Sequence, residues 1–565
     1  MKVVIIGGVA GGASTAARLR RMDEHARIIM LEKGPYISYA NCGLPYYIGE
    51  IIPKRDKLFV QTPQSFGKRF NIDVRVLSEA IQIDRQAKTV TIRDLKTGSD
   101  YTETYDKLVL SPGAEPVRPP LPGIDDPQIF TLRTVSDTDK IKSYLDENPV
   151  KRAVVIGAGF IGLEMAENLH HRGLEVAVVE MAPQVMTPVD FPIASIVHHH
   201  FREKKVGLYL NQAVSRFDRV GGNLIVTLNS GVQLPADLVI LSIGVRPDSR
   251  LAANSGLELG VTRGIKVNEY LQTSDPDIYA VGDAIEFVSP VTGKPTITYL
   301  AGPANKQGRI CANNIVTGNT ERYKGSIGTA IAKVFDLTVG TTGASAALLR
   351  REGIEFAESI THSGSHAGYY PGADTLTLKI NFDPVTGRLL GGQVVGRDGV
   401  DKRTDLLASV IRTGGTIADL TDIEHAYAPP FSSAKDPVNM AGFVAENIMT
   451  RKIQPIQWDE LKSILDSDTS VQLIDVRSPS EVAGGSIQGA VNIPVDDLRN
   501  QLDRISKNKP TVIYCAIGLR GYLASRILLQ SGYSHVRNLS GGFKTWDMVT
   551  CEQSNPVEWE AEVLV

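Results

Sequence analysis

The sequence predicts an α/β chain with two Rossmann-like dinucleotide-binding domains. Two stretches each combine a short apolar strand, a glycine-rich turn, a helix and a second strand that ends on a glutamate. Glycines in such a turn let the backbone approach a pyrophosphate, whose charge the helix N-terminus stabilises. An α+β segment and a further α/β segment follow these two units.

The composition is typical of a globular protein of several domains. The 565 residues are 42% hydrophobic and 22% charged, enough for three or four globular domains. A net charge of -3 favours neither nucleic acid nor an anionic membrane. We find no apolar run of the ~20 residues that span a bilayer and expect no signal peptide before the first strand. The four scattered cysteines do not make a disulfide framework, so we expect a cytoplasmic protein.

The first dinucleotide unit departs from the usual glycine pattern at one position. It consists of a strand at 3–6, a loop with Gly7, Gly8, Val9 and Gly12, a helix at 13–21, a strand at 28–31 and Glu32. Val9 stands where the middle glycine of G-x-G-x-x-G belongs. Glu32 is nevertheless placed to bind a ribose hydroxyl, so we predict a nucleotide site here.

The second unit matches the pattern in full. It consists of a strand at 154–156, a loop with Gly157, Gly159 and Gly162, a helix to 169, a strand at 176–179 and Glu180. Glu180 would repel a 2′-phosphate, and the next three residues (181–183) include no arginine to bind one. We therefore expect NADH rather than NADPH at this site.

A single cysteine, Cys42, lies downstream of the first loop, in the run from Ser38 to Tyr47. No second cysteine follows until Cys311, which falls in an apolar helix and is expected to pack there. A thiolate is the reactive form of cysteine, and a helix N-terminus or a nearby cation lowers its pKa. The chemical partner of Cys42 is therefore predicted to be a small molecule; the alternative is that Cys42 is a small buried hydrophobe.

The order of these motifs resembles the two-dinucleotide flavoproteins. Further matches are the segments 108–114, 238–247 and 273–283. The resemblance implies FAD at the first unit and the nicotinamide nucleotide at the second. It implies that Asp283 holds the ribityl chain of FAD and that Ala304 opens a helix toward the flavin ring. The other nucleotide contacts that it implies are Lys33, Ser111, Gly113 and Gly244.

The run from Ser38 to Tyr47 resembles the coenzyme A-disulfide reductases, and the likeness extends over residues 1 to 450. It implies that Cys42 is the redox nucleophile and forms a mixed disulfide with CoA. Ser38 and Asn41 would contact the pantetheine end. The residues implied to bind the CoA phosphates, Ser14, Arg18 and Arg21, lie three or four positions apart and so share a helix face.

Residues 325 to 449 resemble the dimerisation domain of the same family. The family places two tyrosines of the partner subunit beside the active-site cysteine, and the best matches are Tyr369 and Tyr427. Tyr370 is an alternative to Tyr369. Lys435 would contact CoA.

The last segment, residues 456 to 565, resembles a single rhodanese domain. A buried strand leads to Asp475, Arg477 and Glu481, and a second strand delivers Cys515 into a loop that opens a helix. Backbone N–H groups and the helix dipole of such a loop cradle an anion and stabilise a persulfide on Cys515. Arg520 completes the loop. Ser486 stands where many members have histidine, a departure that leaves the implied persulfide role of Cys515 in place and weakens the expectation of activity on thiosulfate.

The combined prediction is a homodimeric, FAD- and NADH-dependent reductase of CoA persulfide, polysulfide or CoA disulfide. Cys42 would release hydrogen sulfide through a mixed disulfide with CoA, and Cys515 would handle sulfane sulfur. One alternative is an NADH oxidase or peroxidase that uses a Cys42 sulfenic acid; another is a sulfur carrier or redox sensor.

We predict no metal site, since the run 198–200 of three histidines is expected at an exposed helix end. The predicted domains are FAD-binding (1–115 and 255–324), NAD-binding (116–254), dimerisation (325–449) and, after a linker (450–455), rhodanese (456–565).

Overall fold

The computed structural model describes residues 1–467 and 471–554, which form two compact units. Unit 1 comprises Met1–Met181 and Asn211–Gly328, and unit 2 comprises Ala182–Leu210 and the described residues from Thr329 onward. Ala182–Leu210, predicted as part of the NAD-binding domain, thus groups with unit 2. The domain boundaries stay predictions, and the end of the predicted rhodanese domain, 555–565, lies outside the described residues. Within the described residues, no helix is long and apolar enough to cross a membrane.

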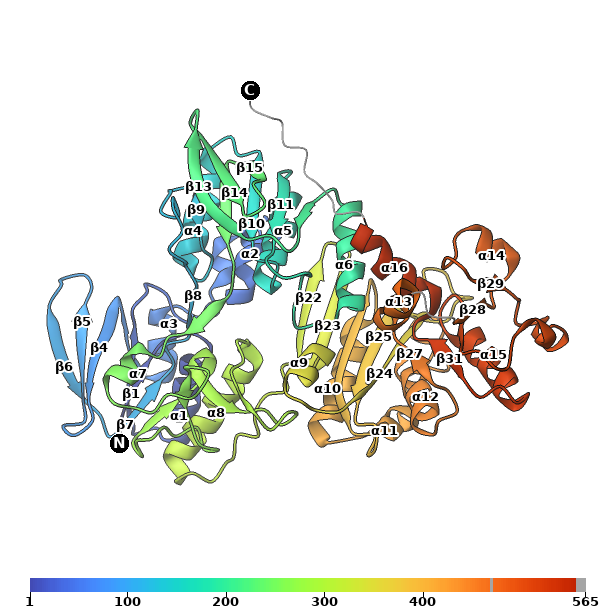
Figure 1. Ribbon diagram of the computed structural model, residues 1–565. Coiled ribbons are helices and arrows are strands. Elements are labelled where there is room, and N and C mark those ends of the chain that lie inside the picture. The colour runs from blue at the N-terminus through green and yellow to red at the C-terminus, as the bar shows by residue number, and fades with distance from the viewer. Residues whose placement is uncertain (468–470, 555–565) are drawn as a thin grey trace. The chain divides into compact units, whose positions relative to one another are not determined.

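The first sheet of unit 1 is parallel and carries the first glycine loop. In spatial order its strands are β19 (Ile278–Ala280), β7 (Lys107–Leu110), β1 (Lys2–Ile6), β2 (Arg27–Glu32) and β3 (Asp73–Val76). Central β1 is almost fully buried because helices cover a parallel sheet on both faces, and it therefore reads as an apolar run. Helix α1 (Ala10–Met22) packs against α8 (Ala301–Thr317) (Figure 1).

A second parallel sheet in unit 1 carries the second glycine loop. It contains, in spatial order, β11 (Glu175–Val179), β10 (Arg152–Ile156), β16 (Leu238–Leu241) and β9 (Ile129–Phe130). Helix α5 (Phe160–His171) packs on β10 and β11. The two strand–loop–helix arrangements therefore repeat, as the sequence predicts.

Short antiparallel elements and further helices complete unit 1. The small sheets are β4 (Ser78–Asp84), β5 (Thr89–Asp94) and β6 (Asp100–Thr104); β13 (Val214–Val220), β14 (Asn223–Leu228) and β15 (Gln233–Ala236); β8 (Ala114–Pro116) with β17 (Val245–Pro247); and β18 (Ile265–Lys266), β20 (Ile285–Val288) and β21 (Pro295–Thr296). The remaining helices are α2 (Leu44–Ile48), α3 (Pro63–Phe70), α4 (Val135–Glu147) and α7 (Arg250–Asn254).

Unit 2 is built on a five-stranded antiparallel sheet. In spatial order its strands are β22 (Ala330–Val334), β23 (Leu337–Gly343), β26 (Leu389–Gly396), β25 (Thr375–Phe382) and β24 (Ala357–Gly364). The helices of this part are α6 (Phe191–Glu203), α9 (Ala346–Arg351), α10 (Val400–Thr413), α11 (Ile417–Asp422) and α12 (Pro437–Met449). Helix α10 packs on β23 and β26, and α12 packs on β24 and β25.

The C-terminal part of unit 2 contains its own parallel sheet. Its strands, in spatial order, are β27 (Pro455–Ile456), β31 (Val536–Leu539), β30 (Thr511–Tyr514), β28 (Gln472–Asp475) and β29 (Val491–Asn492). Its helices are α13 (Trp458–Asp466), α14 (Pro479–Ala483), α15 (Leu519–Gln530) and α16 (Gly542–Ser554).

The C-terminal part is hydrogen-bonded to edge strand β24. The backbone N–H of Ile360 donates to Ser540 Oγ (3.2 Å). His362 joins Thr377 on β25 (2.9 Å) to Thr545 on α16 (2.8 Å). Burial lowers the pKa of His362 to about 3, so the ring is neutral in this joint at pH 7.

The three successive histidines lie in α6, and our expectation that they are exposed is wrong. His198 and His200 are buried, and His199 bonds the carbonyl oxygen of Met548 on α16 (3.2 Å). Helix α6 is covered because α16 packs along it. Among the described residues, no group of histidine, cysteine and carboxylate side chains could hold a metal ion.

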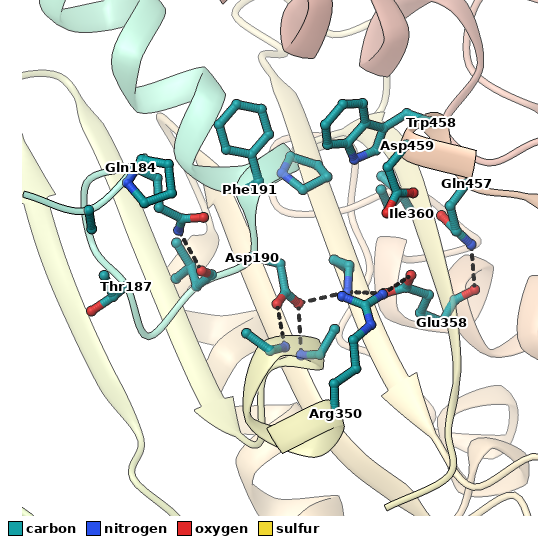
Figure 2. A pocket seen from close by; sticks show the side chains of 17 residues that line it. Gln184, Thr187, Asp190, Phe191, Arg350, Glu358, Ile360, Gln457, Trp458 and Asp459 are labelled. Atoms are coloured by element: carbon teal, nitrogen blue, oxygen red, sulfur yellow. Dashed lines mark hydrogen bonds and ion pairs between the residues drawn. The ribbon is translucent and has the colours of Figure 1, made fainter. Parts of the chain in front are cut away.

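A cavity of about 320 Å³ lies where α6, the antiparallel sheet and the start of α13 meet. Figure 2 shows Phe191 and Trp458 along one side of it and Asp190 and Glu358 at its floor. Lys379 donates to Asp190 (2.7 Å) and to Glu358 (2.5 Å). Burial works against the charge on Lys379, but the two carboxylates outweigh it and raise the pKa of this lysine. The floor is therefore a buried charge network that joins α6 to the sheet.

Candidate functional site

The first glycine loop is shaped by contacts that exclude side chains. Gly7 follows β1 with a φ of +99°, and a Cβ atom there would collide with the carbonyl oxygen of Ser111 at the end of β7. A Cβ atom on Gly12 would collide with the carbonyl oxygen of Gly7. These two positions need glycine, because the turn is tight and α1 lies directly against the strand end.

Val9 is compatible with this loop, although it interrupts the glycine pattern. It precedes α1 with a φ of -100°, outside the left-handed region that favours glycine. Glu32 closes the loop from the end of β2, where its carboxylate accepts the N–H groups of Gly8 (2.9 Å) and Gly34 (2.8 Å). The free N–H groups at the start of α1 and the carboxylate at the strand end fit a dinucleotide.

The second loop repeats the geometry and leaves more room. Gly157 has a φ of +98°, and a Cβ atom on Gly162 would collide with the carbonyl oxygen of Gly157. Gly159 precedes α5, and a Cβ atom added to it would have no other atom within 4 Å. A pyrophosphate therefore has space beside Gly159. The N–H of Ala158 donates to Glu180 (2.7 Å). Gly244, with a φ of +108°, also faces open space.

Arg133 lies at the predicted first nucleotide site, and sequence reasoning missed it. Its guanidinium forms an ion pair with Asp283 (2.9 Å) and donates to the carbonyl oxygen of Ala114 (3.0 Å). It also lies against Gly113, where a Cβ atom would be 3.1 Å from the guanidinium. Arg133 precedes the capped helix α4, and no local motif marks it.

Two further positions predicted for the first nucleotide have neighbours of their own. Lys33 forms ion pairs with Glu115 (3.8 Å) and Asp248 (3.7 Å). Ala304 is buried in the first turn of α8 but does not open this helix, which begins at Ala301. Our expectation for the helix start was therefore wrong by one turn, because the residues before Ala304 already take helical geometry.

The segment that carries Cys42 starts at the first nucleotide loop. The N–H of Ser38 donates to the carbonyl oxygen of Gly8 (2.9 Å), and Ser38 has a φ of +46°. The chain then forms a short 3-10 turn over Asn41–Gly43 and continues into α2. Cys42 is exposed, and the buried Oδ1 of Asn41 accepts no hydrogen bond from the described residues. The fold thus presents Cys42 from the wall of the nucleotide site.

The groups around Cys42 raise the pKa of its thiol. Partial burial is the main cause, the carboxylates of Glu164 and Asp283 add to it, and Arg133 offsets part of it. The net effect of the protein's own groups is therefore a raised pKa, contrary to what we expect of a reactive cysteine. Burial raises the pKa of Glu164 itself to about 7, with a further contribution from Glu167.

Glu164 was also missed from the sequence. It lies on α5, two residues after Gly162, and reaches Cys42 because α2 packs against α5. Their approach is close enough that a Cβ atom on Gly49, at the end of α2, would collide with the Asn168 side chain. Only this packing between distant segments reveals the role of Glu164.

We expect Glu164→Gln to lower the pKa of Cys42. Above pH 7 the native carboxylate repels the thiolate, and a nearby charge of this kind shifts a pKa by roughly one unit. The rate of Cys42 alkylation by iodoacetamide should then rise at a lower pH than in the native protein. Exposed Glu147, at the end of α4, provides the matched control Glu147→Gln. Identical pH profiles for Glu164→Gln and the native protein would contradict this account.

The residues predicted to bind the CoA phosphates lie together on α1. Ser14 is hydrogen-bonded to Asn305 of α8, and Arg18 Nε donates to Asn313 (2.8 Å). Arg21 is exposed, one turn further, and its Nε donates to the carbonyl oxygen of Ala17 (3.1 Å). Their role toward a phosphate stays a prediction.

The two predicted tyrosines of unit 2 meet. The hydroxyls of Tyr369 and Tyr427 are 2.8 Å apart, and the side chains are 76% and 49% exposed. Their hydrogen bond raises the pKa of Tyr369. Tyr370 instead places its ring edge-on to His366. The structure therefore pairs Tyr369, not Tyr370, with Tyr427.

Lys435 lies close in sequence to this tyrosine pair and is exposed. It precedes Asp436, which is fully buried and ion-paired with Arg403 (2.8 Å). The buried pair anchors the turn before α12, so the lysine stands on a fixed backbone.

The loop after β30 holds Cys515 at its bottom. Phe543 and Lys544 of α16 donate backbone N–H groups to the carbonyl oxygens of Cys515 (2.7 Å) and Ala516 (2.9 Å). Gly518 directly precedes α15, and its N–H donates to Cys515 Sγ (3.1 Å). The geometry fits an anion cradle, and the role of Cys515 toward a persulfide stays a prediction.

The charged residues of this loop are paired with one another. Arg520 binds both oxygens of Glu481 (2.6 and 2.7 Å) and lowers the pKa of this carboxyl to about 2. Behind them, Arg477 is buried and ion-paired with Asp475 (2.6 Å).

The four cysteines are all among the described residues, and none forms a disulfide. Cys311 is fully buried in α8, as predicted, and burial raises the pKa of its thiol. Cys515 and Cys551 belong to unit 2. Within unit 1, Cys42 thus has no accessible cysteine to pair with.

Three family models match successive parts of the chain. The pyridine nucleotide-disulphide oxidoreductase model matches residues 1–308, the dimerisation domain of that family matches 329–437, and the rhodanese-like domain matches 457–548. Together they match the predicted order of folds, and the predicted fold class is confirmed.

Whole-protein comparisons agree. A coenzyme A disulfide reductase of Staphylococcus haemolyticus is 36% identical over 447 residues, 79% of this chain and 100% of that protein. The crystal structure of reduced CoADR-RHD from Bacillus anthracis matches with a TM-score of 0.95 and 50% identity over 98% of each chain. An NAD-dependent persulfide reductase from A. fulgidus matches with a TM-score of 0.90 and 39% identity, over 97% of this chain and 100% of the other.

These matches confirm the resemblance inferred from the segment around Cys42 and from the Cys515 loop. The oxidoreductase model alone covers more than half of the chain, and the staphylococcal protein aligns over its whole length. The chain therefore belongs to the pyridine nucleotide-disulphide oxidoreductases, as an enzyme of that family with a dimerisation domain and a C-terminal rhodanese-like domain.

Proposed function

We propose that this enzyme uses FAD and NADH to reduce CoA persulfide, polysulfide and CoA disulfide. The observation that carries the proposal is the solitary Cys42, which is exposed beside the first nucleotide loop and has no second cysteine within reach in unit 1. A disulfide intermediate then needs a thiol from the substrate. The names of the relatives, a CoA disulfide reductase and a persulfide reductase, supply that class of substrate.

Membership of this family implies FAD and NAD(H), and the residues described above fit both. Gly7, Gly12 and Glu32 would hold FAD at the first loop, while Gly157, Gly162 and Glu180 would hold NADH at the second. Glu180 favours NADH over NADPH through charge repulsion with a 2′-phosphate. When bound, FAD relays the electron pair of NADH to a disulfide.

The proposed chemical step belongs to Cys42. Its thiolate attacks the CoA-bound sulfur of CoA–S–SH, the sulfur–sulfur bond of the substrate breaks, and hydrosulfide leaves. Cys42 and CoA are then joined as a mixed disulfide. Two electrons and two protons convert this disulfide into two thiols. Because the pKa of Cys42 is raised, its attack should become faster with increasing pH up to that pKa.

We propose that the enzyme works as a cytoplasmic homodimer in which one subunit supplies its tyrosine pair to the partner's Cys42 site. The high exposure of Tyr369 and Tyr427 and the match to a dimerisation domain support this arrangement. A phenol can donate a proton to a departing sulfur. Ser14, Arg18, Arg21 and Lys435 would bind CoA, with Ser38 and Asn41 at its thiol end.

Loss of the phenol hydroxyls should slow turnover. We expect Tyr369→Phe and Tyr427→Phe each to lower kcat by roughly ten- to a hundredfold, because each removes one partner of the hydroxyl pair. Tyr370→Phe is the control, since its ring packs on His366 outside this pair. Equal loss in all three variants, measured as steady-state NADH oxidation with CoA persulfide, would argue against a specific role.

The test of the proposed function is anaerobic NADH oxidation with CoA persulfide, polysulfide or CoA disulfide, with parallel measurement of released sulfide and free CoA. We expect turnover with all three and sulfide from the first two. Rapid turnover with peroxide or oxygen, and none with these substrates, would instead establish an oxidase or peroxidase. NADH that fails to reduce the bound flavin would favour a sulfur carrier.

A further inference from the structure

The mouth of the Cys515 loop is apolar. Cys515 is 1% exposed, whereas Ile517 and Leu519 next to it are 41% and 58% exposed. Leu523, one turn further along α15, is 47% exposed. A donor must therefore place its terminal sulfur at the bottom of the loop, while the atoms next to that sulfur lie against these side chains.

The loop offers no net positive charge to balance an anionic donor. Arg520 also interacts with Cys515, but both oxygens of Glu481 balance its charge. Arg477 is buried with Asp475. The ammonium group of Lys544 donates to Thr375 (3.0 Å), and burial lowers its pKa, so this cation is directed toward β25.

We infer that the Cys515 loop selects organic persulfides and disfavours thiosulfate, with Ile517 and Leu519 as specificity-determining residues. The inference deepens the proposed persulfide chemistry and rests on the predicted handling of sulfane sulfur by Cys515. The sulfonate of thiosulfate would lose water against Ile517 and Leu519 without a cation in return, which is costly for a charged group. The carbon chain of an organic persulfide gains from the same apolar contact.

The transfer step is an exchange without net oxidation. The Cys515 thiolate attacks the terminal sulfur of R–S–SH, a new sulfur–sulfur bond forms on Cys515, and the original one breaks. The organic thiolate leaves, and Cys515 holds the persulfide, whose charge the Gly518 N–H can stabilise. A second thiol can then remove the sulfur by the reverse exchange.

Sulfur loading of the full-length holoenzyme, in a Cys42→Ser background and without NADH, tests this inference. The donors are CoA persulfide, glutathione persulfide and thiosulfate, and mass spectrometry of the Cys515 peptide detects the added sulfur. Because Cys42 and NADH play no part, a failed reductase function leaves this measurement intact. We expect loading by both persulfides to be at least about tenfold faster than by thiosulfate.

Variants at the mouth make the test specific. Ile517→Arg and Leu519→Arg each add a cation at an exposed position and should raise the thiosulfate-to-persulfide ratio of loading rates by about tenfold. Glu481→Gln should act in the same direction by freeing the charge of Arg520. Val385→Arg, in the exposed turn between β25 and β26, adds the same charge elsewhere and should leave the ratio unchanged.

Three results would overturn the inference. They are thiosulfate loading as fast as persulfide loading, no loading by any donor, and a ratio that Ile517→Arg and Leu519→Arg leave unaltered. Loading by CoA persulfide but not by glutathione persulfide would still support an organic donor and would show that the CoA moiety contributes.

Discussion

Cys42→Ser is expected to abolish the reduction of every sulfur substrate by NADH. A serine hydroxyl cannot form the mixed disulfide with CoA, and the fold offers no substitute, since Cys311 is fully buried. We expect kcat to fall on the order of a thousandfold or more with CoA persulfide, polysulfide and CoA disulfide. Anaerobic NADH oxidation under saturating substrate is the measurement.

Two controls separate the loss of the thiol from other defects. Cys311→Ser alters the other cysteine of unit 1, while Cys515→Ser removes the thiol of the rhodanese-like loop. In Cys42→Ser, NADH should still bleach the flavin at the native rate, because both nucleotide loops are intact. In Cys515→Ser, turnover with CoA persulfide should persist, and only substrates that need sulfur transfer should be affected.

The outcome also decides between reaction classes. If Cys42→Ser retained full turnover with CoA persulfide, the reduction would occur elsewhere and the proposed mechanism would fail. If the single substitution Cys515→Ser abolished turnover with CoA persulfide, the assignment of reduction to Cys42 and of sulfur transfer to Cys515 would be wrong. An oxidase that relies on a Cys42 sulfenic acid would lose activity with peroxide in Cys42→Ser and show no activity with persulfide in the native enzyme.

The parts of the fold that local chemistry dictates could be predicted from the sequence. Gly7 and Gly157 have positive φ angles and face a carbonyl oxygen, so a glycine at each position signals one specific turn. The doubtful position was Val9, whose φ of -100° lies outside the left-handed region that favours glycine. The loop that carries Cys515 could also be predicted from local sequence, because this loop and helix α15 are consecutive in the chain.

The parts that depend on distant contacts could not be predicted. Glu164 and Arg133 affect Cys42 only because separate segments pack around it, and neither residue has a motif of its own. The raised pKa of Cys42 follows from those contacts, so general rules about reactive cysteines gave the wrong direction. The contact of His199 with Met548 has the same origin, since α16 comes from about 350 positions further along the chain and no pattern in α6 predicts it.

Lys379→Met is expected to destabilise unit 2 by about 3–5 kcal/mol, because it leaves the buried carboxylate of Asp190 without its cation. Glu358 also loses its ion pair with Lys379 but keeps the one with Arg350 (3.4 Å). The native side chain of Lys379 is 3% exposed. The measurement is urea unfolding followed by tryptophan fluorescence, since Trp458 lines the cavity above this network. Lys452→Met, at an exposed position of the same unit, should change the midpoint little.

The pH dependence of this loss has a defined sign. In the native protein Lys379 holds the pKa of Asp190 below its usual range against the opposing effect of burial. Without the lysine, burial dominates and raises the pKa of Asp190, so the folded state binds more protons than the unfolded state. The stability deficit should therefore be largest at pH 7–8 and should shrink as the pH falls toward 5.

Adding Asp190→Asn and Glu358→Gln to Lys379→Met removes the unpaired charges and should recover much of the loss. A deficit that is independent of pH and persists in the triple variant would show that packing, not charge, accounts for the role of Lys379.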